Sequence, residues 1–478
     1  MPTKPETPQA AMAPSAPSNF SAGRPAPGPR GRFLLGSIPD LARDPLATFM
    51  DAWRTYGDVA RLHLFRRQPV HLLAHPDDIR HVLQEDNPNY PKNPFNMDKL
   101  KAIVGEGLLT SGGSYWLRQR RLIQPAFHRQ RLAALGPLMT DATDRRLATW
   151  DAAARAGKPL DVAAEMMHLT LDIIARSMFS TDVSGSVDEV ERATGITIAD
   201  SMRRTQSIVD LPRWVPTRAN RQFLNARRSL DQIVYGFIDE RRRSDDGKDD
   251  LLAMLLQAQD ADTGERMTDL QVRDEVMTIF IAGHETTAIA LTWTLYLLSI
   301  HPEIARRHRA ELDTVLQGRP PTIDDLATMP YNRMVIEESM RLYPPAWVVA
   351  RIPLKDDVIG GYRIPAGSGL FLSPYVTHRH PEFWENPEGF DPERFTPERS
   401  AGRPRFAYFP FGGGPRLCIG NNFAMLEAQL LLATITQRYR LDLVPGHPVA
   451  TLPLVTLRPR YGMKMRPIPR RPREGAVA

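Results

Sequence analysis

Cysteine is almost absent from this chain: Cys418 is the single one among 478 residues. One cysteine excludes an internal disulfide framework, and it excludes zinc or iron–sulfur sites that need several cysteines. A thiol that stands alone has three remaining roles, namely a buried hydrophobic side chain, a nucleophile or one axial ligand to a metal. The residues around Cys418 must distinguish these roles.

Long hydrophobic runs are absent as well, because no stretch of about 18 or more apolar residues occurs. The chain is therefore expected to have no membrane anchor, and residues 1–30 lack the continuous apolar segment of a signal peptide. We expect a cytoplasmic protein, monomeric in solution. The net charge is +6, but the basic residues are spread along the chain and form no known nucleic-acid module, so nucleic acid is not expected as a partner.

Composition predicts one large domain between two tails. Residues 1–30 contain eight prolines and little hydrophobic periodicity, which is typical of a disordered tail. Residues 466–478 are rich in proline and arginine and are expected to form a second flexible tail. The motifs described below lie between Trp116 and Cys418 and have to meet at one site, so residues 31–465 are expected to form a single domain.

The segment from Phe411 to Gly420 is built to hold a thiolate. Its glycines permit a tight turn with exposed amides, and Arg416 can reach an anionic group. The run 421–438 has the apolar spacing of a helix, whose positive N-terminal end would favour a thiolate at Cys418. The glycines expected to turn this loop are Gly412, Gly413, Gly414 and Gly420.

This segment resembles the haem-binding signature of the cytochrome P-450 superfamily, FxxGxRxCxG, at every specified position. The resemblance implies that Cys418 is the axial ligand of the iron of haem b and that Phe411 shields its sulfur. A thiolate in that position favours cleavage of a bound O–O unit. It also implies the family's fold, which is mainly α with a smaller β region (α+β) and holds haem between a long central helix and the cysteine loop.

The expected central helix spans about 32 residues after the capping pair Thr268 and Gln271, or ~48 Å. Near its middle, Glu285 and Thr286 form a candidate proton relay. From the residues alone, an alternative remains: a threonine bonded to its own helix and a glutamate in an ion pair. The segment resembles the family's acid–alcohol motif, which implies catalytic roles for Glu285 and Thr286, with Ala282 and Gly283 beside the cofactor. A mid-helix glycine needs a reason, and close approach of a flat cofactor is the one expected. His284 is not expected to be a second haem ligand, since oxygen needs an open site.

Three further motifs match the family in its order along the chain. Glu338 and Arg341 resemble the ExxR pair, which the family ties to an arginine, here Arg394, in support of the fold. Trp116 and Arg120 resemble a pair that holds a haem propionate. Arg351 matches a further propionate position. Any one of these arginines, considered alone, would be interpreted as a solvated surface charge.

The resemblance implies a monooxygenase, an oxidoreductase acting on paired donors with incorporation of molecular oxygen, which hydroxylates or epoxidises a lipophilic molecule. O2 is the co-substrate, and no flavin or iron–sulfur cluster is expected in this chain, so a ferredoxin or flavodoxin with its reductase must supply electrons. An acidic donor would fit a basic face, for which the candidates are Arg118, Arg121, Arg129, Arg131, Arg403 and Arg405. The residues expected to line the substrate pocket are Phe95, Met97, Leu100, Ile103, Phe280, Ala346, Val348, Val349, Leu454 and Val455.

Two other functions stay open at this point. A peroxide-driven haem-thiolate peroxygenase would share Cys418 and Arg416 but would not need the Glu285–Thr286 relay. A haem-binding sensor would bind ligands without turnover, and the intact relay argues against it.

Overall fold

The protein is described here from a computed structural model, which covers residues 23–64, 68–183, 185–206, 210–243, 250–259, 264 and 266–470. The α-helices are α1 (Ile38–Arg43), α2 (Pro45–Tyr56), α3 (Pro76–Arg80), α4 (Pro94–Val104), α5 (Gly113–Ile123), α6 (Arg129–Ala133), α7 (Gly136–Arg155), α8 (Val162–Phe179), α9 (Val187–Gln206), α10 (Arg218–Arg243), α11 (Leu251–Gln257), α12 (Asp269–Ile300), α13 (Pro302–Leu316), α14 (Pro330–Leu342), α15 (Pro374–Thr377), α16 (Pro397–Ser400) and α17 (Asn421–Arg438). None of these helices is long and apolar enough to cross a membrane, within the residues described.

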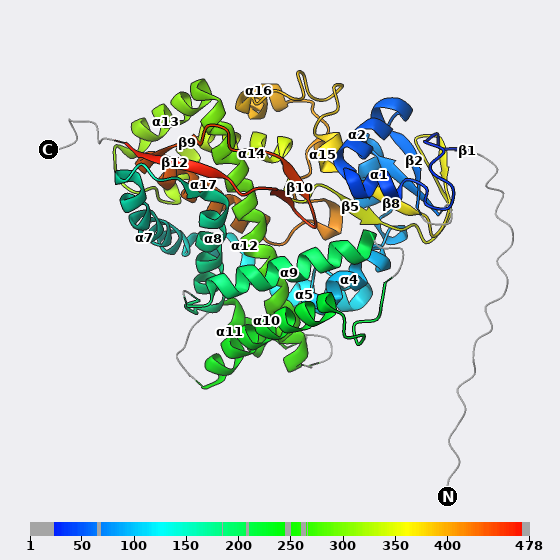
Figure 1. Ribbon diagram of the computed structural model, residues 1–478, viewed down its shortest axis with the longest axis horizontal. Coiled ribbons are helices and arrows are strands. Elements are labelled where there is room, and N and C mark those ends of the chain that lie inside the picture. Colours follow the sequence, from blue (N-terminus) through cyan, green and yellow to red (C-terminus); the bar gives the residue numbers. More distant parts are fainter. Residues whose placement is uncertain are drawn as a thin grey trace, which may run out of the picture.

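The strands are short and form a minor part of the fold. They are β1 (Arg24–Pro25), β2 (Val59–His63), β3 (Pro69–Leu73), β4 (Leu160–Asp161), β5 (Val349–Arg351), β6 (Asp357–Ile359), β7 (Tyr362–Ile364), β8 (Gly369–Leu372), β9 (Tyr439–Leu443), β10 (Thr451–Pro453), β11 (Leu457–Pro459) and β12 (Lys464–Pro469). The largest sheet has the order β2-β3-β8-β5, with β3 and β8 parallel and the other pairs antiparallel. Figure 1 shows this sheet beside α1 and α2 at one end of the molecule and the helical region at the other.

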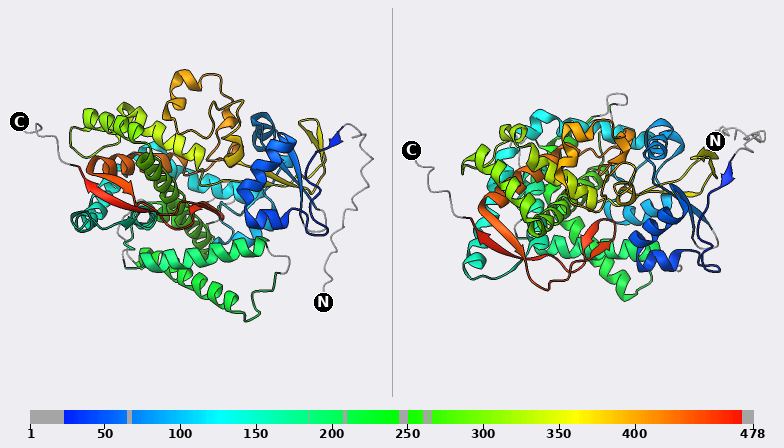
Figure 2. Two further views of the ribbon diagram at one scale, coloured as in Figure 1. Left: turned by 45° about the horizontal axis from the view of Figure 1, so that its top comes forward. Right: turned by 90° about the horizontal axis from the view of Figure 1, so that it is seen from above.

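Helix α12 is the central element of the fold. It begins after a complete capping box, in which Thr268 and Gln271 each bond the other's backbone amide, as predicted. It ends at His301, before Pro302, which cannot continue the helix. Most of its residues are buried, and α8, α14 and α17 pack against it. Figure 1 shows α12 crossing the molecule, and Figure 2 shows it from two further directions.

The boundaries of the domain differ from those expected from composition. Strand β1 lies within the expected tail 1–30 and pairs in parallel with β7, so residues 23–30 belong to the described fold. At the other end, β12 continues to Pro469 beside β9, and Arg470 forms an ion pair with Asp313 at 2.8 Å. Backbone pairing over these residues outweighs their proline content. Residues 1–22 and 471–478 lie outside the described part of the chain.

Candidate active site

The cysteine loop, residues 411–420, contains a short 3₁₀ turn, Gly414–Arg416, and ends where helix α17 begins. The Cys418 amide donates to the Phe411 carbonyl oxygen at 3.0 Å, which closes the loop. Cys418 is exposed by surface area, yet enough protein surrounds its sulfur that burial raises the pKa of the thiol. The Gly420 amide and the Arg120 guanidinium lower that pKa and so favour the thiolate. Helix α17 begins at Asn421, as predicted, and adds its positive N-terminal end.

Two of the loop glycines are required by the backbone. Gly412 and Gly414 have φ of +73° and +62°, where a side chain is disfavoured. Gly413 is extended and Gly420 has φ of −89°, so neither uses the left-handed conformation that glycine permits. A Cβ on Gly413 would still lie 2.2 Å from the Phe406 ring, which gives that glycine a packing reason.

Two arginines stack against one tryptophan beside this loop. The Arg416 guanidinium lies 3.8 Å from the centre of the Trp116 ring, and that of Arg120 lies 5.6 Å from it. Arg120 also donates to the Leu417 carbonyl at 2.9 Å, and Arg416 to the Ser111 carbonyl at 3.0 Å. The structure thus brings together three residues that the sequence predicted to bind the cofactor.

Two more cations complete what we call the cation group, Lys92, Arg120, Arg351 and Arg416. Burial, with Arg416 adding to it, lowers the pKa of Arg351 to about 10. Burial and then Arg416, Arg351 and Arg120 lower the pKa of Lys92 to about 6, so this lysine carries its charge at neutral pH only when an anion lies beside it. Its Nζ donates to the Leu108 carbonyl at 3.0 Å. Sequence reasoning missed Lys92 because nothing in its local pattern distinguishes it from a surface lysine.

The cation group has no carboxylate in ion-pair contact within the described part of the chain, and the one carboxyl whose charge acts on Lys92 is Glu275, where burial raises the pKa to about 8. Among the described residues, no carboxylate forms an ion pair with Lys92, Arg120, Arg351 or Arg416. Partly buried cations without an anion are costly, so the site calls for an anionic group. The propionates of haem b would supply that charge, and Cys418 would supply the axial ligand. The residues present therefore fit haem b.

The middle of α12 presents one accessible face. Ala282 is exposed and Gly283 and Thr286 are partly exposed, whereas their neighbours in the helix are buried. The Thr286 hydroxyl donates to the Ala282 carbonyl at 3.0 Å. A Cβ on Gly283 would lie 2.7 Å from Ile174 of α8, so the packing of two helices gives this glycine a second reason. Its place beside the cofactor stays a prediction. His284 lies off that face, because its Nδ1 bonds the Phe280 carbonyl at 2.6 Å and its ring is buried.

Glu285 is bound by groups far along the chain. Its Oε1 accepts from Nε of Arg458 at 2.8 Å and from the Thr456 hydroxyl, and its side chain is 3% exposed. Sequence reasoning missed Arg458 and Thr456, which have no motif around them. Thr286 is bonded to its own helix and Glu285 is in an ion pair, which is the alternative to a proton relay that the sequence left open. Their relay function therefore stays a proposal.

The predicted supporting trio is a buried network. Glu338 and Arg341, both fully buried, form two hydrogen bonds at 2.7 and 2.8 Å, and Arg394 Nε donates to Glu338 at 3.2 Å. Arg341 further donates to the carbonyl oxygens of His378 and Gly389 at 2.9 and 2.8 Å. This network binds α14 to residues 378–394, which precede the cysteine loop.

The residues expected to line a substrate pocket divide into two groups. Ile103 and Phe280 are 2% and 0% exposed and belong to the main core, and Phe280 packs against Phe237 at 5.6 Å. Helix α12 turns Phe280 toward α10, so its expected pocket role is wrong. The partly exposed members are Met97, Leu100, Ala346, Val348, Val349, Leu454 and Val455. The side chain of Phe95 lies outside the described part of the structure.

The basic residues near the cysteine loop are not equivalent. Arg403 stacks 4.1 Å from the Trp384 ring and donates to the Arg394 carbonyl at 2.8 Å, so its charge serves the fold. Arg118 is partly exposed. The fully exposed members are Arg121, Arg129, Arg131 and Arg405.

Comparison with known proteins identifies the family. The profile described as Cytochrome P450 matches residues 26–465. The chain is a member of the cytochrome P450 family. Cyclooctatin synthase of Streptomyces melanosporofaciens is 39% identical over 90% of this chain and 92% of its own. Pentalenene oxygenase of Streptomyces avermitilis is 35% identical over 89% of this chain and 93% of its own.

The fold comparison agrees with this P450 assignment. The crystal structure of the cytochrome P450DA heme domain covers 94% of this chain at a TM-score of 0.86 and 30% identity, and 99% of that structure is matched. The expected α+β P450 fold is therefore confirmed. The family binds haem b and uses O2, and the protein is a P450 monooxygenase.

Proposed function

We propose that this P450 inserts one oxygen atom of O2 into a C–H bond of a cyclic terpenoid, with electrons from a separate protein. Written for a substrate RH, RH + O2 + two electrons + two protons gives ROH + H2O. The observation that carries the proposal is the cysteine loop beside a cation group that forms no ion pair with a carboxylate of the described residues. Haem b, when bound, supplies the oxygen chemistry at its iron.

The chain's own residues have distinct tasks in this proposal. Cys418 binds the iron, and Lys92, Arg120, Arg351 and Arg416 hold the propionates. Thr286 lies on the accessible face of α12, where its hydroxyl would turn from the Ala282 carbonyl to donate a hydrogen bond to the co-substrate O2. Glu285 is the nearest carboxyl along the helix that can restore the proton.

The substrate class rests on the relatives and on the lining. Three relatives are named cyclooctatin synthase, cyclooctat-9-en-7-ol 5-monooxygenase and pentalenene oxygenase. They are 39%, 38% and 35% identical to this chain, respectively. The partly exposed lining residues are apolar apart from backbone groups, which suits a compact hydrocarbon. Hydroxylation is the expected outcome, with epoxidation where a double bond lies closest.

The electron donor is proposed to be an acidic ferredoxin or flavodoxin. Its docking surface would include the exposed Arg121, Arg129, Arg131 and Arg405. Complementary charge would speed association and make it sensitive to salt.

The decisive experiment is the spectrum of the dithionite-reduced protein with carbon monoxide, for wild type and for Cys418→Ala. We expect a strongly red-shifted Soret band that is lost in the variant. A band typical of histidine ligation in wild type would refute the proposal.

Substrate class is then tested by titrating cyclic terpene alcohols and, as controls, linear fatty acids. The ferric spin state and the incorporation of label from ¹⁸O2 are followed. Turnover with peroxide alone, unaffected by Thr286→Ala, would instead establish a peroxygenase.

A further inference from the structure

A small cavity lined by both apolar and polar side chains lies on the side of α12 that carries His284. Its volume is about 10 Å³, room for roughly one water molecule. Helices α8, α9 and α12 and strand β11 contribute its walls. The lining residues are Met167, His168, Leu171, Val187, Glu191, Thr194, His284 and Arg458.

The outer end of this cavity is a histidine between carboxylates. His168 Nε2 lies 3.3 Å from Glu191 Oε2 and 3.5 Å from Asp188 Oδ1. The side chains of Asp188, Glu191 and His168 are 95%, 42% and 22% exposed. Exposure to solvent therefore decreases from Asp188 through Glu191 to His168. The hydrogen bond from His168 lowers the pKa of Glu191, and Arg458 and His284 add to that effect.

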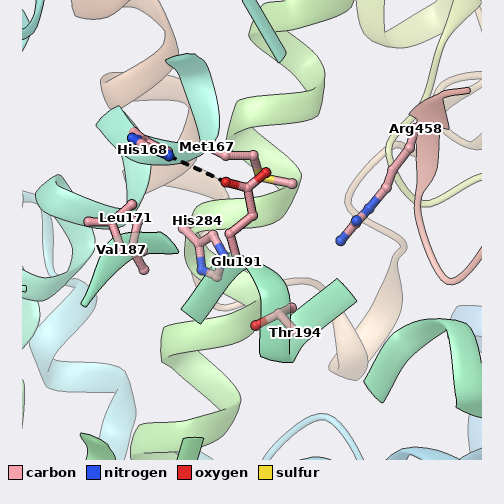
Figure 3. Close-up of a pocket in the computed structure, with 8 residues that line it drawn as sticks. All are labelled: Met167, His168, Leu171, Val187, Glu191, Thr194, His284 and Arg458. Atoms are coloured by element: carbon pink, nitrogen blue, oxygen red, sulfur yellow. Dashed lines mark ion pairs between the residues drawn. The ribbon is translucent and has the colours of Figure 1, made fainter. Parts of the chain in front are cut away.

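The inner end of the cavity is Arg458, whose other partner is Glu285. Arg458 is 20% exposed and bonds Glu285 Oε1 at 2.7 Å through its terminal nitrogen, while Glu285 is 3% exposed. Figure 3 shows His168, Glu191 and His284 on one side of the cavity and Arg458 reaching in from the other. Arg458 therefore binds Glu285 and lines the same cavity as Glu191, whose pKa its charge helps to lower.

His284 is suited to accept a hydrogen bond in this cavity. A carbonyl oxygen can only accept, so the His284 Nδ1 that bonds Phe280 must carry the proton. Burial lowers the pKa of His284 and keeps the ring neutral, which leaves its Nε2 as an acceptor.

The monooxygenase reaction consumes two protons per turnover, and Glu285 is too buried to take them directly from bulk water. We propose that the His168–Glu191 pair is the proton uptake site of this enzyme and that it passes protons through water in the cavity, past Arg458, to Glu285. This proposal rests on the proposed function. In the transfer, an O–H bond forms on Glu285 as one breaks on the water, which then takes the proton of His168; no electrons move.

The proposal makes His168 and Glu191 relay residues that touch neither substrate nor cofactor. The titratable and charged groups around His168 and the cavity are Asp188 and Glu191 on α9, His284 on α12 and Arg458 on β11, and Glu285 of α12 binds Arg458. A purely structural role for the pair would change stability and leave proton-dependent steps as they are.

The test uses the full-length haem protein, after the carbon monoxide and spin-state assays have established the proposed function. For Glu191→Gln and His168→Gln we expect a fall in kcat of roughly ten-fold, smaller than the ~100-fold or more for loss of a direct proton donor, with KM unchanged. The solvent isotope effect should rise, and more hydrogen peroxide should form per electron. Glu191→Asp should restore most of the rate.

His75→Gln is the matched control, because His75 also stands beside a carboxylate, Asp77 at 3.8 Å, and is 27% exposed. It should leave all these measurements unchanged. In a Glu285→Gln background, Glu191→Gln should have no further effect on the isotope effect. Additive effects there, or wild-type isotope effects and peroxide yields in both relay variants, would overturn the proposal.

Two further readouts do not depend on turnover. In NMR spectra at one fixed pH, Glu191→Gln should change the chemical shifts of the His168 ring, because the carboxylate beside its Nε2 is lost. A high-resolution crystal structure should show water in contact with Glu191 and Arg458. Unchanged chemical shifts of the His168 ring or a dry cavity would count against the relay.

Discussion

At the scale of the residue, single glycines set the shape of the cysteine loop. Gly412 and Gly414 share a left-handed backbone conformation but differ in what surrounds them. A Cβ on Gly414 would lie 1.8 Å from the Leu83 carbonyl oxygen, whereas a Cβ on Gly412 would meet nothing within 4 Å. Gly414 is thus required both by its close contact and by its dihedral angle, whereas Gly412 is required by its dihedral angle alone.

This difference predicts unequal effects of two matched substitutions. Gly412→Ala should cost ~1–2 kcal/mol of stability from its backbone conformation and leave haem binding intact. Gly414→Ala should cost more and reduce haem content, because the backbone beside Leu83 must move. The haem-to-protein ratio and the thermal unfolding midpoint measure both effects. Equal losses in the two variants would show that the contact with Leu83 relaxes freely.

At the scale of the element, α14 carries both a buried and an exposed charge pair. Glu338 serves Arg341 and Arg394 inside the protein, so removing it leaves two buried guanidinium groups without their carboxylate. Arg333 and Glu337 on the same helix form an i,i+4 pair at 3.0 Å, with Arg333 61% exposed. Without Arg333, Glu337 is 15% exposed and can take up a proton, since burial already raises its pKa. The two guanidinium groups that Glu338 serves cannot give up their charge.

We therefore expect Glu338→Ala to lower the free energy of unfolding by about 3–5 kcal/mol. Arg333→Ala, its control on the same helix, should cost under ~1 kcal/mol. Denaturant unfolding followed by circular dichroism gives both values. A small cost for Glu338→Ala would mean that the carbonyl partners of Arg341 suffice to hold its charge.

At the scale of the whole molecule, buried ionisable groups tie stability to pH. Burial lowers the pKa of His308 to about 4 and raises that of Glu427 to about 8, the latter opposed in part by the Thr287 hydroxyl. Between about pH 4.5 and 8 the folded protein keeps a proton on Glu427 that the unfolded chain releases. Stability therefore falls as pH rises through this window.

Glu427→Gln isolates that dependence because the amide cannot ionise. We expect wild type to lose stability relative to the variant by up to ~1.4 kcal/mol per pH unit between pH 5 and pH 8. Unfolding of both proteins across that range tests it, since all other titrating groups are shared. A difference that does not change with pH would show that Glu427 ionises alike in both states.

The sequence by itself determined the features that depend on local spacing. These are the caps and ends of α12 and α17, the cysteine loop, and the P450 family that its motifs identify. Only the tertiary structure decided which side chains meet across the chain: Arg458 reaches Glu285 over 173 residues, and Lys92 joins the arginines near Cys418. Hydrogen bonds and periodicity within a few residues leave a pattern in the sequence. Contacts between distant segments depend on how helices pack, and packing leaves no such local pattern.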